Sequence, residues 1–348
     1  MSKLYWNLFD DLDCFDVGNS SACPGQWRTK DALYFNHNER AVPVLLREEL
    51  KVDCYRLQAE IACPGPIGYI GLVFGAKDAL NYEMVYVSPG TEETPGEIQY
   101  DPMMNGSTTW QIYNGPRYQS PAPFRRGEWV KLALDIHPSH AAVWVGDTAT
   151  PQLVISNLQH GSSEGRIGVW GYLPGYIRNL SVEEIPAVAA KPSAESLKQL
   201  AEETFVTEWL VSKPYSEGGQ AEEESLWIRA NVEENGTLNL NRLFSSGNGL
   251  TVRAECKLIL SDNIESLLTF GFSDRLRLWI NDEEVYQGDW KWDPPASDGR
   301  IRPDLASVGV RWREGTNTIR AEITSTEVVF GWGMSVRTGL NSRLLKTT

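Results

Sequence analysis

The sequence predicts an all-β protein made of two antiparallel β-sandwich (jelly-roll) domains joined by a short helical linker. Short stretches of alternating apolar and polar residues recur between Gly, Pro and Asn turns, as expected of strands with one buried face. The content of 13 Trp, 13 Tyr and 30 Gly suits strands and turns better than helices. A chain of 348 residues is long enough for two domains with separate cores.

The first half shows the alternation most clearly at Val130, Leu132, Leu134 and Ile136, which share one face of a predicted strand. Tyr55, Leu57, Ala59 and Ile61 likewise alternate with Arg56, Gln58 and Glu60. The strands predicted for this half are 55–61, 69–74, 82–87, 110–113, 129–136, 142–145 and 166–173. Their short, regular spacing is typical of a sandwich.

The composition changes across residues 187–203, where Pro, Ala, Ser and Glu dominate and the strand pattern stops. Leu197 and Leu200 fit a short helix within this segment. We therefore expect a linker here, between a first domain at residues 1–186 and a second at residues 204–348.

The second half returns to strand patterns. Leu276, Leu278 and Ile280 alternate with Arg275, Arg277 and Trp279. The strands predicted here are 205–211, 226–231, 249–260, 266–272, 276–280, 318–324 and 331–336. This half is expected to form a second antiparallel sandwich or jelly roll.

Two segments of the first half resemble the last strands of concanavalin A-like, laminin-G-type domains. Residues 165–172 read GRIGVWGY, and residues 177–183 read IRNLSVE. Upstream, residues 127–135 (GEWVKLALD) and 142–147 (AVWVGD) are similar to the strand and hairpin that precede them in this family. The resemblance covers most of residues 1–185 and implies a lectin-like or glucanase-like sandwich.

Three segments of the second half resemble the galactose-binding-like jelly rolls attached to many glycoside hydrolases. They are residues 270–274 (FGFSD), 278–285 (LWINDEEV) and 313–319 (REGTNTI). Asp282 stands where the family usually has glycine, so the turn there is expected to differ. The resemblance spans about residues 205–338. Both families are rich in carbohydrate-binding modules, and both also contain members that serve only as scaffolds.

The formal net charge of −14 is spread over both halves, and no basic stripe is present. Nucleic acid and anionic membrane surfaces are therefore poor candidate partners. The first residues lack the pattern of a signal peptide, and no apolar run reaches the length of a membrane span. Five cysteines without a CxxC pair favour reduced thiols and a cytoplasmic location. The oligomeric state is left open.

A sugar-binding site needs aromatic rings on solvent-facing strand positions. On the predicted strand 166–173, Trp170 and Tyr172 alternate with the aliphatic Ile167 and Val169, so we expect the two rings on the outer face. Trp144 is out of phase with its aliphatic neighbours and is expected to join them. The alternative is that these rings pack under loops or in interfaces.

Further candidate ligand contacts lie in loops. Tyr113 and Tyr118 belong to a Pro- and Gly-rich segment that is expected to form a rim of the site. In the second half, Trp290 and Trp292 are candidates in the segment GDWKWDPP at residues 288–295. The alternative is that this loop closes onto the first domain.

The sequence names no catalytic residue and requires no cofactor. Glu83, Asp101 and Glu128 are isolated acids, whereas concanavalin A-like glucanases carry their carboxyls on alternate positions of one strand. His137 and His140 flank Pro and Ser in a predicted hairpin turn. A structural calcium ion is possible where four aspartates crowd one loop region. These are Asp289, Asp293, Asp298 and Asp304.

Three function classes follow. The first, which we favour, is a non-catalytic carbohydrate-binding protein with aromatic stacking sites. The second is an enzyme acting on glycosides with carboxyls from separated strands. The third is a structural or interaction protein that presents its loops to another chain.

Overall fold

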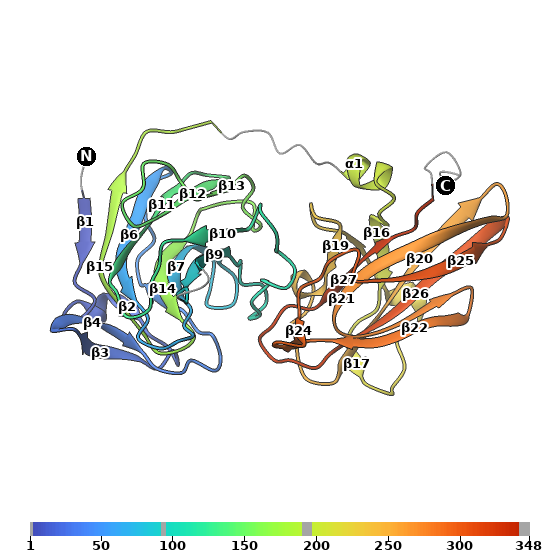
Figure 1. Cartoon of the computed structure of the whole chain (residues 1–348), viewed down its shortest axis with the longest axis horizontal. Helices are drawn as coiled ribbons and strands as arrows, with labels where there is room; N and C mark the ends of the chain where they lie inside the picture. The colour runs from blue at the N-terminus through green and yellow to red at the C-terminus, as the bar shows by residue number, and fades with distance from the viewer. Residues whose placement is uncertain (1–2, 92–94, 190–196, 341–348) are drawn as a thin grey trace. The chain divides into compact units, whose positions relative to one another are not determined.

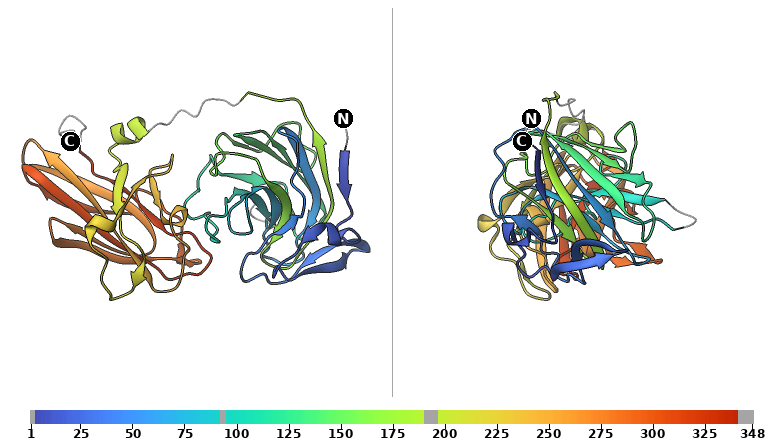
Figure 2. Two further views of the ribbon diagram at one scale, coloured as in Figure 1. Left: turned by 180° about the vertical axis from the view of Figure 1, so that it is seen from behind. Right: turned by 90° about the vertical axis from the view of Figure 1, so that its left-hand side faces the viewer.

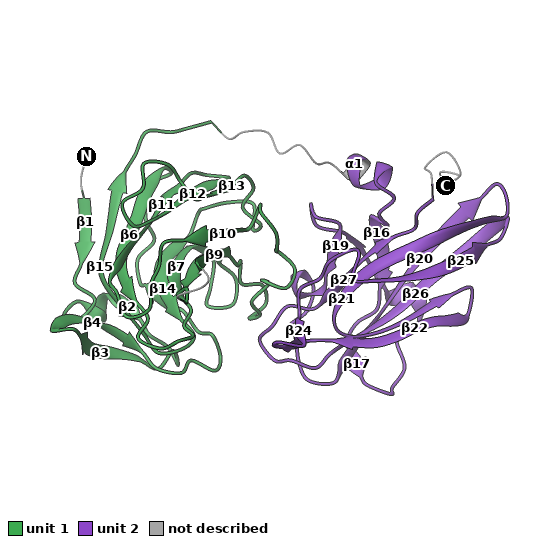
Figure 3. Cartoon of the chain, viewed as in Figure 1, with its two compact units in different colours: residues 1–193 green, residues 194–348 purple. Residues whose placement is uncertain are grey.

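The computed structural model describes residues 3–91, 95–189 and 197–340. It divides into two compact units, residues 1–193 and 194–348 (Figure 3). Nearly all of the regular structure is antiparallel strand (Figure 1), which confirms the predicted all-β sandwich class. The short elements besides strands are α1 (Leu197–Glu202), η1 (Leu12–Cys14), η2 (Glu224–Leu226) and η3 (Leu240–Arg242). Within the described ranges, no helix has the length and apolar character needed to cross a membrane.

The first unit contains two large sheets. Sheet I has the strand order β13-β12-β11-β6-β15-β4-β3, with β1 also paired to β15. Its strands are β13 (Leu153–Ile155), β12 (Ala141–Val145), β11 (Val130–Ile136), β6 (Tyr55–Ala62), β15 (Gly175–Glu184), β4 (Lys30–Phe35), β3 (Ala22–Trp27) and β1 (Lys3–Trp6). Sheet II has the order β10-β9-β8-β7-β14-β5-β2. Its strands are β10 (Gln119–Ala122), β9 (Gly96–Tyr100), β8 (Glu83–Ser88), β7 (Ile70–Ala76), β14 (Arg166–Gly171), β5 (Val44–Leu46) and β2 (Phe15–Asp16).

The two sheets of the first unit can be followed from two further directions in Figure 2. Sheet I follows the predicted alternation: along β6, Leu57 and Ile61 are fully buried, while Gln58 and Glu60 remain partly exposed. Sheet II differs, because β7 is buried along its whole length. A strand buried on both sides must have something covering each face, and this requirement shapes the site described below.

The sequence interpretation failed at one strand and missed several others. Residues 110–113 form a turn rather than a strand, because the backbone N–H groups of Ile112 and Tyr113 both donate to the carbonyl of Thr109. Strand β9 precedes this turn in the chain and strand β10 follows it. Strands β1 to β5 precede residue 50, where the sequence shows no clear alternation. The predicted hairpin turn at His137 and His140 is confirmed by a 3.0 Å hydrogen bond between their backbones.

The second unit is built around one long strand, β21 (Ile264–Ile280). Its sheet, sheet III, has the order β18-β16-β20-β26-β21-β27-β19, with β17 paired to β20, and β22 and β25 paired to β21. The remaining strands are β18 (Ile228–Asn231), β16 (Glu208–Val211), β20 (Leu250–Leu260), β26 (Gly315–Ser325), β27 (Gly333–Arg337), β19 (Thr237–Asn239), β17 (Tyr215–Ser216), β22 (Glu283–Trp290) and β25 (Ala306–Trp312). A separate ribbon joins β23 (Trp292–Asp293) and β24 (Ser297–Asp298).

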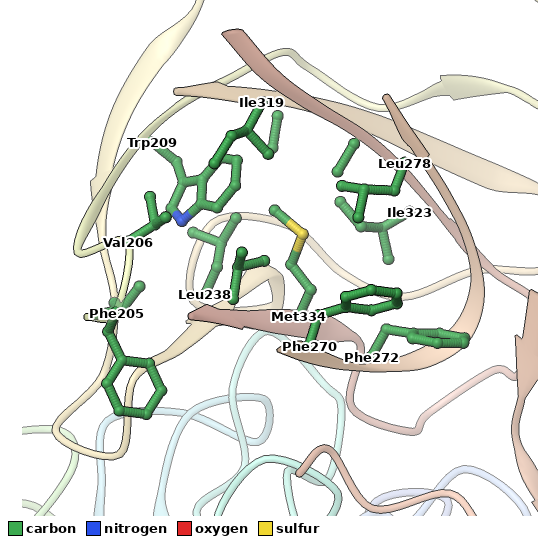
Figure 4. Packing of buried hydrophobic residues seen from close by; sticks show 14 of the residues in the cluster. Phe205, Val206, Trp209, Leu238, Phe270, Phe272, Leu278, Ile319, Ile323 and Met334 are labelled. Carbon is green, nitrogen blue, oxygen red and sulfur yellow. The ribbon is translucent and has the colours of Figure 1, made fainter. Parts of the chain in front are cut away.

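Strand β21 changes partners at Asp274. Before this residue it pairs with β25 and β27, and from it onward with β22 and β26. Asp274 has φ +71°, a left-handed conformation that turns the strand between its two sets of partners. The core between these layers is aromatic and aliphatic, and Figure 4 shows Trp209, Leu238, Phe270 and Met334 converging in it. The sequence had divided β21 into two separate strands.

Candidate functional site

A row of three residues crosses neighbouring strands of sheet II. Trp170 in β14 pairs with Gly71 in β7, and Gly71 pairs with Tyr86 in β8. The rings of Trp170 and Tyr86 stack across the glycine, with centroids 5.7 Å apart and an interplanar angle of 28°. A Cβ atom on Gly71 would lie 2.2 Å from the carbonyl oxygen of Val85 and 2.6 Å from Cα of Tyr86. Any residue with a Cβ at position 71 would therefore push β7 and β8 apart, so the close pairing of this row requires glycine.

The segment between β4 and β5 covers this row. Its buried Asn38 donates from Nδ2 to the carbonyl oxygens of Val42 and Gly171, each at 2.9 Å. The Asn38 backbone N–H donates to the carbonyl of Tyr172, also at 2.9 Å. One asparagine thus fixes a segment near residue 40 to the end of β14, 133 positions along the chain.

The indole of Trp170 is enclosed by this segment. Its Nε1–H donates to the carbonyl oxygen of Ala41 at 2.9 Å, and the hydroxyl of Tyr82 donates to the same oxygen at 3.2 Å. Trp170 lies on the outer face of β14, as its alternation predicts, but only 2% of its surface is exposed. The expectation that it faces solvent is therefore corrected, because a loop from a distant part of the chain covers it.

Tyr172 and Tyr69 are the rings that reach solvent here, and both are partly exposed. The Tyr172 N–H donates to the Tyr69 carbonyl at 3.1 Å, and the two ring centroids are 6.4 Å apart. Tyr172 also lies 6.3 Å from Trp170 in a nearly parallel stack, and its ring meets that of His37 edge-on at 5.6 Å. Tyr172 therefore links the buried rings to the surface.

The covering segment carries three exposed polar side chains, of which His37 contacts Tyr172. The side chains of His37 and Glu39 are 51% and 82% exposed, with Nδ1 and Oε1 4.0 Å apart. Arg40, which follows, is also exposed. We call the group formed by Tyr69, Tyr86, Trp170 and Tyr172 with His37, Glu39 and Arg40 the tyrosine site. Of the residues that sequence analysis proposed, it contains Trp170 and Tyr172. The other five members of the site were not predicted, because the pattern of one strand does not show which strands and loops lie beside it.

Trp144 does not join the tyrosine site, which corrects the expectation. It lies in β12 of sheet I, out of phase with the buried Val143 and Val145 as predicted. Its ring is covered by the guanidinium of Arg56, 5.1 Å from the centroid, and Arg56 is held by Asp135 through hydrogen bonds of 2.6 and 2.8 Å. The guanidinium covers one face of the partly exposed Trp144 ring, and a ligand contact by Trp144 stays a prediction.

Tyr113 and Tyr118 are 0% and 3% exposed, so they form no solvent-exposed rim. Their rings meet at 5.3 Å, and both lie 6.4 Å from the ring of Tyr100. Because the segment that contains them folds back as a turn instead of extending as a strand, their rings pack against β9. The expectation that these two tyrosines form an exposed rim is therefore corrected. A ligand contact by either residue stays a prediction.

Trp290 and Trp292, predicted to lie in one loop, instead end β22 and begin β23 because residues 283–290 pair with β21, and the two differ in exposure. Trp290 is partly buried and donates from Nε1 to the carbonyl of Arg300 at 3.1 Å. Trp292 is 43% exposed, and its backbone N–H donates to a carboxylate oxygen of Glu327 at 3.4 Å. Trp292 is thus the candidate of this loop that offers an accessible indole.

The four aspartates of this loop do not converge on one point. Asp289 accepts a hydrogen bond of 2.9 Å from Arg275, and Asp298 is bound by Arg302. In the ranges that the structure describes, no group of three or more His, Cys, Asp or Glu side chains is arranged to hold a metal ion. Structural calcium in this loop stays a prediction from composition.

Two of the three isolated acids of the first unit are bound into local structure, while the third, Glu128, is exposed. Glu83 is fully buried and accepts hydrogen bonds from the Tyr100 hydroxyl at 2.5 Å and the His160 N–H at 2.7 Å. Asp101 is also fully buried; burial raises its pKa to about 7, and it accepts from the Thr109 N–H at 2.5 Å. These contacts anchor the loops that follow β9 and β13.

No protein-family model matches this chain, and no curated protein matches its sequence. The solved structures that match in part include the carbohydrate-binding module CBM66 from Bacillus subtilis, 13% identical over 49% of this chain and 96% of that one, with a TM-score of 0.35. Sheep galectin-11 is 17% identical over 41% of this chain and 97% of its own, with a TM-score of 0.28. The galectin LEC-6 of Caenorhabditis elegans is 12% identical over 43% and 96%, with a TM-score of 0.29.

TM-scores this low define neither fold nor function, so the class of the protein rests on its own sheets. It is a two-unit, all-β sandwich protein with an aromatic site partly open to solvent on the first unit. The resemblances to laminin-G-type and galactose-binding-like domains stay predictions from the sequence.

Proposed function

We propose that the protein binds carbohydrate at the tyrosine site. The observation that carries this proposal is the position of Tyr172, partly exposed and stacked on Trp170 beneath it. An aromatic ring backed by a second ring presents a flat, rigid surface, and the apolar face of a pyranose packs well against such a surface.

The polar side chains of the covering segment, which contacts Tyr172 through His37, suit the edges of a sugar. His37, Glu39 and Arg40 offer hydrogen-bond donors and acceptors at exposed positions. A sugar ring has hydroxyl groups around its edge and C–H groups on its faces. A stacked tyrosine beside a mixed set of polar side chains matches both features.

The site is held in place without a ligand. Asn38 ties the covering segment to β14, and the Ala41 carbonyl accepts from both Trp170 and Tyr82. Fixing these groups before binding lowers the entropy that association would otherwise lose. Rigid rings are therefore expected to contribute more affinity than the same rings on a mobile loop.

Calorimetric titration of the full chain with a panel of neutral oligosaccharides tests the proposal. Tyr172→Ala should weaken binding about tenfold or more, because the loss of one stacking ring is worth about 1.4 kcal/mol. Tyr172→Phe, which keeps the ring, should bind within about threefold of the wild type.

Tyr5→Ala provides a matched control, since Tyr5 is a tyrosine of sheet I that is 54% exposed and lies outside the site. Its affinity should equal that of the wild type. If no member of the panel binds the wild-type chain, or if Tyr172→Ala binds as tightly as Tyr5→Ala, the tyrosine site is not the binding site.

Trp292 is our proposed contact on the second unit, carried by its 43% exposed indole. Trp292→Ala in the same titration should reduce the heat of binding or its stoichiometry. An unchanged binding isotherm would remove Trp292 from the proposal.

A further inference from the structure

A second group of aromatic residues lies on sheet I, at its β3 edge. Cys23, Gly25 and Trp27 alternate along β3 and therefore share one face. Cys23 pairs with Tyr34 of β4, and Tyr34 pairs with Tyr176 of β15, so both tyrosines belong to the same face. We call Trp27, Tyr34 and Tyr176 the aromatic patch.

Tyr176 contacts both other rings of the aromatic patch. Trp27 and Tyr176 stack with centroids 5.6 Å apart and an interplanar angle of 21°, and Tyr34 lies 4.8 Å from Tyr176. Gly25 provides the room: a Cβ there would lie 2.7 Å from Cβ of Tyr34 and 3.6 Å from Cε1 of Tyr176. All three rings are partly exposed.

Trp27 is anchored by a contact that is distant in sequence. Its Nε1–H donates to the carbonyl oxygen of Gly127 at 3.1 Å, and the Gly127 N–H donates to the Cys63 carbonyl at 2.7 Å. This fixes the indole of an edge strand to the loop before β11. The patch is thus rigid, like the tyrosine site, although it lies on the other sheet.

Charged side chains border the patch on the same face. Lys30 pairs in register with Trp27, and its Nζ lies 3.8 Å from an oxygen of Glu60. Arg178, two residues after Tyr176, donates to the same oxygen of Glu60 at 3.1 Å. The patch therefore has hydrogen-bond donors and acceptors beside its rings.

We infer that the aromatic patch is a second carbohydrate-binding site, for a neutral oligosaccharide. Strand β3 contributes no Leu, Ile or Val to this face, where its residues besides Trp27 are Cys23 and Gly25. Rings with a polar border and little aliphatic surface match a sugar better than the apolar core of a protein interface. The net charge of −14 disfavours acidic glycans. This inference extends the proposed function to another sheet and does not depend on the tyrosine site.

Cys23 offers a direct readout because it is exposed within the patch. Cys14 is the other exposed thiol, so the Cys14→Ser chain should react with a fluorescent maleimide mainly at Cys23. A neutral oligosaccharide at saturating concentration should slow this reaction about fivefold or more, and a uronic-acid oligosaccharide of the same length should not.

Substitutions then separate the two sites. Tyr176→Ala should remove the protection of Cys23, whereas Tyr172→Ala should leave it intact. Calorimetry of the Trp292→Ala chain, which lacks the proposed contact on the second unit, should give two sugar sites per chain, and adding Tyr172→Ala or Tyr176→Ala should leave one. Tyr176→Phe, which keeps the ring, should retain both sites.

The possible results distinguish this inference from the proposed function. Binding at one site that Tyr172→Ala abolishes, with no protection of Cys23, overturns the second site and leaves the first. If sugar protects Cys23 and Tyr172→Ala does not change sugar binding, the tyrosine site is overturned and the aromatic patch remains. Slower Cys23 labelling as protein concentration rises, without sugar, would identify the patch as a contact between copies of the chain and overturn the inference.

Discussion

Two glycines, Gly71 and Gly25, determine where aromatic rings can lie on the sheets of the first unit. Gly71 stands between the ring-bearing strands β14 and β8, Gly25 lies on the edge strand β3 beside Tyr34, and each would bring a Cβ closer than 3.0 Å to a neighbouring residue. Because glycine has no side chain, the rings beside it can cross the strand and meet. The sequence shows these glycines, but not which rings flank them, since strand pairing is needed to identify the neighbours.

The substitution Gly71→Ala tests this reading. The added Cβ would meet the Val85 carbonyl at 2.2 Å, and both atoms belong to buried strands that cannot move apart cheaply. We expect the first unit to lose about 2 kcal/mol of unfolding free energy. Differential scanning calorimetry would show this as a lower midpoint for that unit.

Gly309→Ala is the matched control in β25, because no atom lies within 4 Å of the Cβ it would add. Its effect should stay within about 0.5 kcal/mol, as for most surface substitutions. An unchanged midpoint for Gly71→Ala would mean that β7 and β8 can separate to admit a methyl group.

At the scale of elements, the segment between β4 and β5 and the corner of β21 each join parts that are distant in sequence. Asn38 connects its segment to Gly171, and Asp274 accepts hydrogen bonds from the backbone N–H groups of Thr326 and Glu327. Both are buried polar side chains that bind backbone groups of distant segments, and Asp274 also accepts from the Ser273 hydroxyl. Such contacts fix loop positions that strand alternation leaves open.

The corner of β21 predicts a pH dependence of the second unit. Burial, together with the nearby Asp274 carboxylate, raises the pKa of Glu327 to about 7. A raised pKa means that the folded state holds this proton more tightly than the unfolded state. The stabilising contribution is complete below the unfolded value and is lost as pH rises through about 7.

Because Glu327 is partly exposed and solvent screens its charge, the second unit should lose only on the order of 1 kcal/mol between pH 5 and pH 8.5 through this group. Glu327→Gln, which cannot ionise, should lose less over the same range. Glu314→Gln, at an exposed glutamate, should parallel the wild type. Calorimetry at the two pH values measures the difference, and identical pH dependence for Glu327→Gln and wild type would contradict the prediction.

At the scale of the whole molecule, the chain consists of two units with separate cores. The second unit has its own continuous cluster of buried residues, which runs from Leu200 to Leu340 and contains no residue of the first. The segment after β15 is irregular and exposed, with Val188 61% exposed. Each unit therefore has the interior that a domain needs to stay folded by itself.

Insertion of a specific protease site after Val188 tests whether each unit stays folded by itself. After cleavage, both fragments should keep their near-ultraviolet circular dichroism and their cooperative thermal transitions. An insertion of the same length without the cleavage sequence is the control. Loss of either transition on cleavage would show that the two units depend on each other for stability.

The alternation of residues by itself determined the fold class and the face on which most side chains lie. Trp144 alternates with the buried Val143 and Val145, as the sequence indicates. Trp170 packs in a cluster that excludes its neighbour Val169, and Tyr172, one residue past the end of β14, packs against the same cluster. This is predictable because successive side chains of a strand point to opposite faces whatever the strand pairs with.

Tertiary structure alone decided which sheet each strand joins and what covers its outer face. Trp144 and Trp170 are on different sheets, and Trp170 is buried by Ala41, 129 residues away. Strand pairing and loop coverage are contacts between distant segments, and the period of a single strand contains no record of its partners. The sequence therefore predicted rings on outer faces, and only the assembled sheets show that Tyr172 is the one left partly open beside Trp170.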